Sequence, residues 1–154
     1  MDNFQKTSRI ANDLAKDFFK KFNYESTKDE FDVADFYITV KGNKWIGEIK
    51  NRNAKAIWYN DFIMELHKFN GLKDRMKLES CTNMLYVNFF GDVCMIWQYS
   101  DIIKYGRIED KMCAKYSAVQ SGYVSKQVIM LPKVNATIYH RNSAGDWIKQ
   151  VNNK

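Results

Sequence analysis

Apolar and polar residues alternate in two short segments on either side of Gly42. Val33 to Val40 and Trp45 to Lys50 are rich in β-branched and aromatic residues, which is typical of β-strands. Between them, Gly42-Asn43 is a two-residue turn signal. The pattern therefore predicts a β-hairpin with its turn at Gly42-Asn43.

The register of this hairpin brings charged side chains together. With the turn at Gly42-Asn43, Asp35 pairs with Lys50 and Tyr37 pairs with Glu48, and because side chains alternate between the faces of a strand, all four share one face. Directly opposed side chains are about 5 Å apart and diagonal ones about 7–8 Å apart. We therefore expect Asp35 and Glu48 to reach one hard cation, with Lys50 beside them.

Other periodic segments predict the elements around the hairpin. Apolar residues at helical spacing predict helices over residues 3–22, with a stripe of Ile10, Leu14, Ala15, Phe18 and Phe22, and over residues 58–78, with a stripe of Phe62, Leu66, Phe69, Lys73 and Met76. Met84 to Phe90 and Val93 to Tyr99 predict a second hairpin around Gly91-Asp92, apolar on both faces and so covered on both sides. Short strands are expected over residues 126–131 and 136–140, and an exposed connection over residues 113–125.

The first hairpin and the order of the elements resemble the PD-(D/E)xK nuclease superfamily. Asp35 matches the first acid and Glu48-Ile49-Lys50 matches the (D/E)xK element, while Ala34 stands where the familiar motif has proline. The resemblance covers roughly the first two thirds of the chain. It implies an α/β fold with a restriction-endonuclease-like αβββαβ core, in which helices flank a mixed central sheet.

The resemblance also implies Mg²⁺-dependent hydrolysis of phosphodiester bonds, with Mn²⁺ as a substitute. Asp35 and Glu48 would be the metal ligands, with the carbonyl of Ile49 as a third, and Lys50 would orient the attacking water. Negative charge builds on the phosphoryl oxygens in such a reaction, and a divalent cation and a lysine both stabilise it. The expected catalytic residues are therefore Asp35, Glu48 and Lys50.

Polar residues near this site are candidates for supporting roles. In resembling nucleases a polar residue of the second helix contacts the phosphate or steadies the lysine, which favours Glu65 and Lys68 here, whereas His67 is expected at the surface. The basic residues expected to bind nucleic acid are Lys44, Arg52, Lys55 and Lys73. A further acid for the metal site remains open among Asp13 and Asp17 of the first helix and Glu25, Asp29, Glu30 and Asp32 after it.

Composition narrows the functional class. The chain has 154 residues, 45% of them hydrophobic, with 1 Pro and 7 Gly, which predicts a single domain over residues 1–154. Three widely spaced cysteines and two histidines argue against disulfides and histidine-rich metal sites. Without an apolar run of about 20 residues or a signal core, a soluble cytoplasmic protein without membrane contact is expected.

The net charge of +6 favours a polyanionic partner. We expect DNA, with an endonuclease acting on branched DNA or DNA ends favoured, and leave RNA and a homodimer open. The alternatives are a non-catalytic nucleic-acid- or protein-binding module on a degenerate nuclease fold, or a surface salt bridge across the hairpin, worth about 0.2–1 kcal/mol. Glu109-Asp110-Lys111 also fits the motif but stands in a polar stretch without strand alternation.

Overall fold

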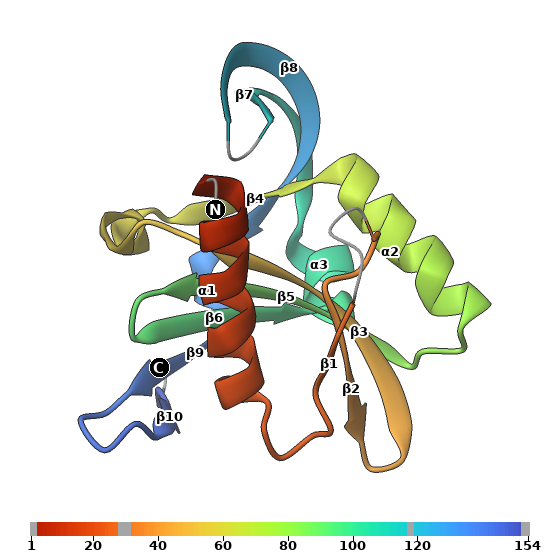
Figure 1. Ribbon diagram of the computed structural model, residues 1–154. Helices are drawn as coiled ribbons and strands as arrows, with labels where there is room; N and C mark the ends of the chain where they lie inside the picture. Colours follow the sequence, from red (N-terminus) through yellow and green to blue (C-terminus); the bar gives the residue numbers. More distant parts are fainter. Residues whose placement is uncertain (1–2, 28–31, 117–118, 152–154) are drawn as a thin grey trace.

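Two β-sheets and three α-helices make up the part of the protein that the computed structural model describes, residues 3–27, 32–116 and 119–151 (Figure 1). In chain order the elements are α1 (Asn3–Phe18), β1 (Glu25–Ser26), β2 (Phe36–Val40), β3 (Asn43–Asn51), the 3-10 helix η1 (Ala54–Trp58), β4 (Asp61–Glu65), α2 (Leu66–Leu78), β5 (Asn83–Phe90), β6 (Val93–Gln98), α3 (Tyr99–Tyr105), β7 (Arg107–Tyr116), β8 (Val119–Pro132), the 3-10 helix η2 (Lys133–Asn135), β9 (Thr137–Arg141) and β10 (Trp147–Lys149).

The larger sheet has seven strands in the order β1-β2-β3-β5-β6-β9-β10. Strands β3 and β5 are parallel and the other neighbours are antiparallel, so the predicted α/β class with a mixed central sheet is confirmed. One face packs against α1 through Ala11, Ala15 and Phe19. The other face packs against α2, α3 and the smaller sheet, whose strand order is β4-β8-β7.

The second predicted hairpin is confirmed as β5 and β6. Phe90 pairs with Val93 across the Gly91-Asp92 turn, where Gly91 has a φ of 63°. Both faces of β5 are buried, as the apolar residues on each face predicted. Strands β3 and β5 thus run side by side at the centre of the sheet, and both sides of that centre are covered.

The turn of the first hairpin lies one residue earlier than predicted, which shifts the pairing of its two strands by two residues. Phe36 pairs with Gly47 and Val40 with Asn43, so the turn is Lys41-Gly42, not Gly42-Asn43. Lys41 and Gly42 both have a positive φ, 49° and 80°, as a type I′ turn requires at both central positions. Because the shift is an even number of residues, it leaves every side chain on the face that the alternation predicted.

The first helix is shorter than predicted and is rotated about its axis. It ends at Phe18, not Phe22, and its most buried positions are Ala11 and Ala15, followed by Phe19 just beyond its end. Phe22 is 39% exposed. Two alanines on the inner face let the helix approach the sheet closely, and the Phe19 ring stacks on Phe36 with centroids 5.1 Å apart.

The predicted helix over residues 58–78 is wrong in its first part. Residues 61–65 form β4, which pairs with β8 from Asp61 opposite Pro132 to Glu65 opposite Val128. Phe62 and Met64 are buried at strand spacing. The helical stripe assigned to this segment fits only from residue 66 on, where α2 buries Phe69 and Leu72.

The expected exposed connection over residues 113–125 is also wrong. It belongs to the long β7–β8 hairpin, which pairs from Arg107 opposite Met130 to Cys113 opposite Val124. The string Glu109-Asp110-Lys111 therefore lies in a strand, contrary to expectation, and all three residues are exposed. The strands expected over residues 126–131 and 136–140 are confirmed as parts of β8 and as β9. No helix within the described ranges is long and apolar enough to cross a membrane.

Candidate active site

Glu48 and Lys50 lie two residues apart on β3, at the centre of the larger sheet. They share the face of Ile46, which packs into the core beside α2, whereas Ile49 packs on the α1 side. The Glu48 side chain is 4% exposed and its Oε1 lies 3.5 Å from Nζ of Lys50, whose side chain is 28% exposed. The acid is thus buried beneath a lysine that still reaches solvent.

Asp35 contacts β3 from the other side of the hairpin, just before β2 begins. Its main-chain N–H donates to the carbonyl of Gly47 over 2.9 Å, and its Oδ2 accepts from the N–H of Ile49 over 2.7 Å. The observed register places Asp35 opposite Glu48, not opposite Lys50 as predicted. Asp35 therefore lies at the edge of β3, where β2 has not yet begun to cover it.

The main chain of Ile49 adds a third oxygen at this edge. The N–H and C=O of one residue in a β-strand point to the same side, and the N–H of Ile49 points to Asp35. The carbonyl of Ile49 therefore opens beside the Asp35 carboxylate. These are the three groups that the sequence offered as metal ligands.

The electrostatics of the two acids favour a cation. Burial raises the pKa of Asp35, and the N–H of Ile49 and the charges of Lys50 and Lys68 only partly oppose this. Burial likewise raises the pKa of Glu48, where the charge of Lys50 opposes it and that of Asp35 adds to it. Burial lowers the pKa of Lys50, but Glu48, Tyr86 and Asp35 together outweigh this and raise it, so Lys50 is protonated at neutral pH.

One oxygen of Glu48 has no partner in the structure. Its Oε2 is buried and makes no hydrogen bond, although a buried acceptor left unpaired costs about 1–3 kcal/mol. Among the described residues, no group of three or more His, Cys, Asp or Glu side chains is placed to hold a metal ion. The candidate ligand set is therefore two carboxylates and a main-chain carbonyl, with the unpaired oxygen of Glu48 among them.

Arg52 does not extend into solvent, as a surface residue that binds nucleic acid would. Its Nε donates to Oδ1 of Asn88 over 2.8 Å, and its Nη2 donates to the carbonyl of Ile63 over 2.8 Å and to the hydroxyl of Tyr86 over 3.0 Å. This network joins β3, β5 and β4 directly beneath the end of β3. Arg52 is thus placed as an internal brace of the site, and its assignment to nucleic-acid contact has no support in this geometry.

Tyr86 and Asn88 belong to the site, although the sequence pattern did not predict them there. The parallel register sets Tyr86 beside Glu48 and Asn88 beside Lys50, and both side chains are fully buried. Nδ2 of Asn88, like Oε2 of Glu48, has no hydrogen-bond partner. The available signal was a polar asparagine in a strand that is otherwise apolar, since buried polar groups are usually paired.

Glu65 and Lys126 form an ion pair on the α2 side of the site. Glu65 is the last residue of β4, and Nζ of Lys126 on β8 lies 2.6 Å from its Oε1. Although burial raises the pKa of Glu65, the bond and charge of Lys126 outweigh it, so the pKa lies below its ordinary value; Lys50 adds to this effect. Glu65 was expected to contact the phosphate or to steady the lysine of the site, whereas the structure shows its carboxylate paired with Lys126.

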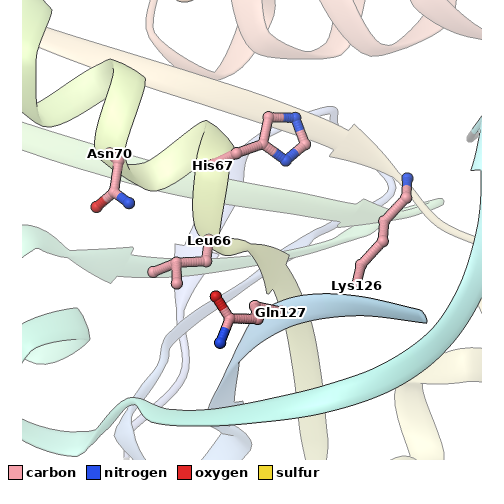
Figure 2. A pocket seen from close by; sticks show the side chains of 5 residues that line it. All are labelled: Leu66, His67, Asn70, Lys126 and Gln127. Carbon is pink, nitrogen blue, oxygen red and sulfur yellow. The ribbon is translucent and has the colours of Figure 1, made fainter.

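A shallow hollow of about 330 Å³ opens beside this ion pair (Figure 2). Leu66, His67 and Asn70 line it from α2, and Lys126 and Gln127 line it from β8. His67 is exposed, as predicted, and its Nε2 lies 3.6 Å from Oε2 of Glu65. Lys68, the next residue of α2, acts electrostatically on both Asp35 and Glu48, so a second lysine besides Lys50 lies near the acids.

The other predicted basic residues are spread more widely. Nζ of Lys44 lies 3.7 Å from Oε1 of Glu79 and over the ring of Tyr37, Lys55 is exposed in η1 and Lys73 is half-buried on α2. Of the further acids, Asp32 pairs with Arg75 at 3.1 Å and Glu25 is exposed. Asp29 and Glu30 lie outside the described residues.

Comparison with known proteins identifies no family for this chain. No protein-family model matches the chain, and no curated protein matches it either.

Proposed function

We propose that this protein is a metal-dependent deoxyribonuclease of the PD-(D/E)xK type. The observation that carries the proposal is the buried Glu48 carboxylate, with one oxygen unpaired, between Asp35 and Lys50 at the open edge of β3. An apolar side chain, or a polar one with all its hydrogen bonds made, would stabilise the folded protein more at such a position than this carboxylate does.

The order of the elements supports the same proposal. Helix α1 precedes the β2–β3 hairpin, and α2 then leads into β5, which pairs parallel with β3. This is the order expected of the αβββαβ core. Strand β4 departs from it, because it lies between the hairpin and α2 and belongs to the smaller sheet.

The residues present fit a hard divalent cation. Mg²⁺ binds through one or two carboxylates and keeps several waters, which matches Asp35, Glu48 and the carbonyl of Ile49. Such an ion, when bound, supplies charge stabilisation for the phosphoryl oxygens and an acidified water. It would also meet the unpaired Oε2 of Glu48 and offset the burial that raises the pKa of both acids.

Lys50 would orient the attacking water and stabilise developing charge. Its raised pKa keeps it protonated, so it donates hydrogen bonds and does not act as a general base. Arg52, through Asn88 and Tyr86, would hold the end of β3 and thus the position of Lys50. Removing Arg52 would disturb the site without removing a group that touches the substrate.

DNA is the proposed substrate because of the charge around the acids. Lys50 and Lys68 act electrostatically on Glu48, and Lys126 lines the hollow of Figure 2. Contacts to phosphates supply most sequence-independent affinity. RNA offers the same phosphates and is therefore a required arm of the test.

The test is cleavage of end-labelled single-stranded, duplex, four-way-junction and supercoiled DNA and of RNA, each with Mg²⁺, Mn²⁺ or EDTA. We expect cleavage with either metal and none with EDTA. Glu48→Gln and Lys50→Met should each lose most of the activity, by about 10²-fold or more, yet keep DNA binding. Asp146→Asn and Lys149→Met remove the same kinds of charge from exposed positions near the far edge of the sheet and should cleave like the parent.

Two outcomes would overturn the proposal. Cleavage that survives full chelation would contradict the metal's role. DNA binding without cleavage under any of these conditions, in a protein whose circular dichroism shows it to be folded, would favour the non-catalytic module.

A further inference from the structure

The β7–β8 hairpin has no part in the proposed chemistry. It is the longest strand pair of the protein, and in Figure 1 its outer part projects beyond the helices. Within the described part of the chain, β7 pairs along one edge only, with β8. Its other edge therefore presents unpaired main-chain N–H and C=O groups, which are a template for another strand.

The exposed side chains of this hairpin include large apolar ones. Ile108 is 62% exposed, Met112 is 66% exposed and Tyr123 is 76% exposed. The register pairs Met112 with Ser125, so Tyr123, two residues from Ser125, is a diagonal neighbour of Met112 on the same face. Ile108 shares that face, because it is four residues from Met112 along the strand.

Glu109 and Lys111 lie on the other face of β7, whereas Asp110 lies between Ile108 and Met112 on the apolar face. Among the described residues, these three charged side chains make no ion pair or side-chain hydrogen bond, whereas the neighbouring Arg107 pairs with Asp61 at 3.4 Å. Lys111 stands directly opposite Lys126 in the register. Glu65 already neutralises Lys126, so Lys111 is the lysine of this pair that lacks a negative partner among the described residues, and a negative group beside it would be favourable.

The order of these residues is self-complementary. If two copies of β7 pair antiparallel about a twofold axis at Asp110, Ile108 faces Met112 of the second copy, and Glu109 faces Lys111 of the second copy. Each contact occurs twice, as the symmetry of an isologous interface requires. The ion pairs lie on one face and the apolar pairs on the other, where Asp110 stands between the apolar pairs and meets its own equivalent unfavourably.

We propose that the protein forms a homodimer in which the free edges of two β7 strands pair antiparallel about Asp110, joining the two smaller sheets into one six-stranded sheet. This proposal does not depend on the nuclease activity. Charged residues on an edge strand can also serve only to prevent such pairing. An edge that only prevents pairing would not require the order of residues that makes β7 complementary to a second copy of itself. The experiment below distinguishes a pairing edge from a protective one.

The test is charge reversal followed by sedimentation equilibrium over a range of protein concentrations. Glu109→Lys and Lys111→Glu each turn both ion pairs into repulsions and should weaken the dimer by roughly tenfold to a hundredfold. The double variant Glu109→Lys/Lys111→Glu restores opposite charges at both pairs and should dimerise like the parent. Asp110→Asn removes the one repulsive pair and should tighten the dimer several-fold.

Lys149→Glu, which reverses a charge on exposed β10, is the matched control and should dimerise like the parent. Hydrogen exchange should show that the amides of residues 107–113 become more protected as the protein concentration rises. A parent that is monomeric at about 100 μM, well above the micromolar dissociation constant of a weak specific pair, would overturn the proposal. A dimer that both single reversals leave intact, or that the double variant fails to restore, would overturn this register.

Discussion

Replacing Glu48 by glutamine tests whether its carboxylate is kept for metal binding or for stability. Glu48 is 3% exposed, its Oε2 has no partner and burial raises its pKa. Glutamine has nearly the same shape without the charge. Its amide nitrogen would also lack an acceptor, so the metal-free variant should gain only about 1 kcal/mol, or about 2–4 °C in Tm for a protein of this size.

The response to Mg²⁺ should be the reverse. At ten times its dissociation constant, a ligand that binds only the folded state adds RT ln 11, about 1.4 kcal/mol. For the parent this is a rise in Tm of about 3–6 °C. The Glu48→Gln protein should show less than about a third of that rise, because it loses a carboxylate ligand.

Thermal unfolding followed by circular dichroism, in EDTA and then in excess Mg²⁺, measures both effects. Asp146→Asn, an exposed acid distant from β3, should melt like the parent in both buffers. If Glu48→Gln melts several degrees below the parent in EDTA, the contact with Lys50 is a stabilising ion pair and the carboxylate is not an uncompensated charge. If neither Mg²⁺ nor Mn²⁺ shifts the parent, the ligand set is wrong.

Three further perturbations test the structure around the site. Gly47→Ala would place a Cβ 2.1 Å from the ring of Phe36 and should destabilise the protein by about 1–3 kcal/mol in urea unfolding. Phe36→Leu should partly restore the stability of this variant. A Gly47→Ala protein as stable as the parent would show that the two strands do not pack as described. Arg52→Ala leaves Oδ1 of Asn88 and the hydroxyl of Tyr86 without this donor, whereas the carbonyl of Ile63 still accepts from Tyr86. The variant should cost about 2–4 kcal/mol, and an unchanged urea midpoint would identify Arg52 as a surface residue. Lys126 holds the pKa of Glu65 below its ordinary value, so the stability from this pair is fully present above about pH 4.5 and is lost as the pH falls through the lowered pKa. The Tm of Glu65→Gln should therefore lie about 2–6 °C below that of the parent near pH 7 and approach it near pH 3; a gap that does not change with pH would contradict the ion pair.

The sequence alone determined which side chains of β3 share a face. Alternation has a period of two, so Glu48 and Lys50 had to project together whichever turn closed the hairpin. The turn itself was misplaced, because Gly42-Asn43 and Lys41-Gly42 are both able to adopt positive φ and only the structure shows which pair does so. The even shift moved Asp35 from Lys50 to Glu48 without moving it off the site.

Only the tertiary structure decided what surrounds these residues. Residues 61–65 carry apolar side chains that fit either a helix or a strand, and pairing with β8 made them β4. The same long-range pairing brought Lys126 to Glu65, and the parallel register of β3 and β5 brought Tyr86 and Asn88 beneath the acids. The spacing of apolar and polar residues within a segment indicates its period and which side chains share a face. Which distant strand covers a face depends on pairing between segments far apart in sequence, and no local pattern contains that partner.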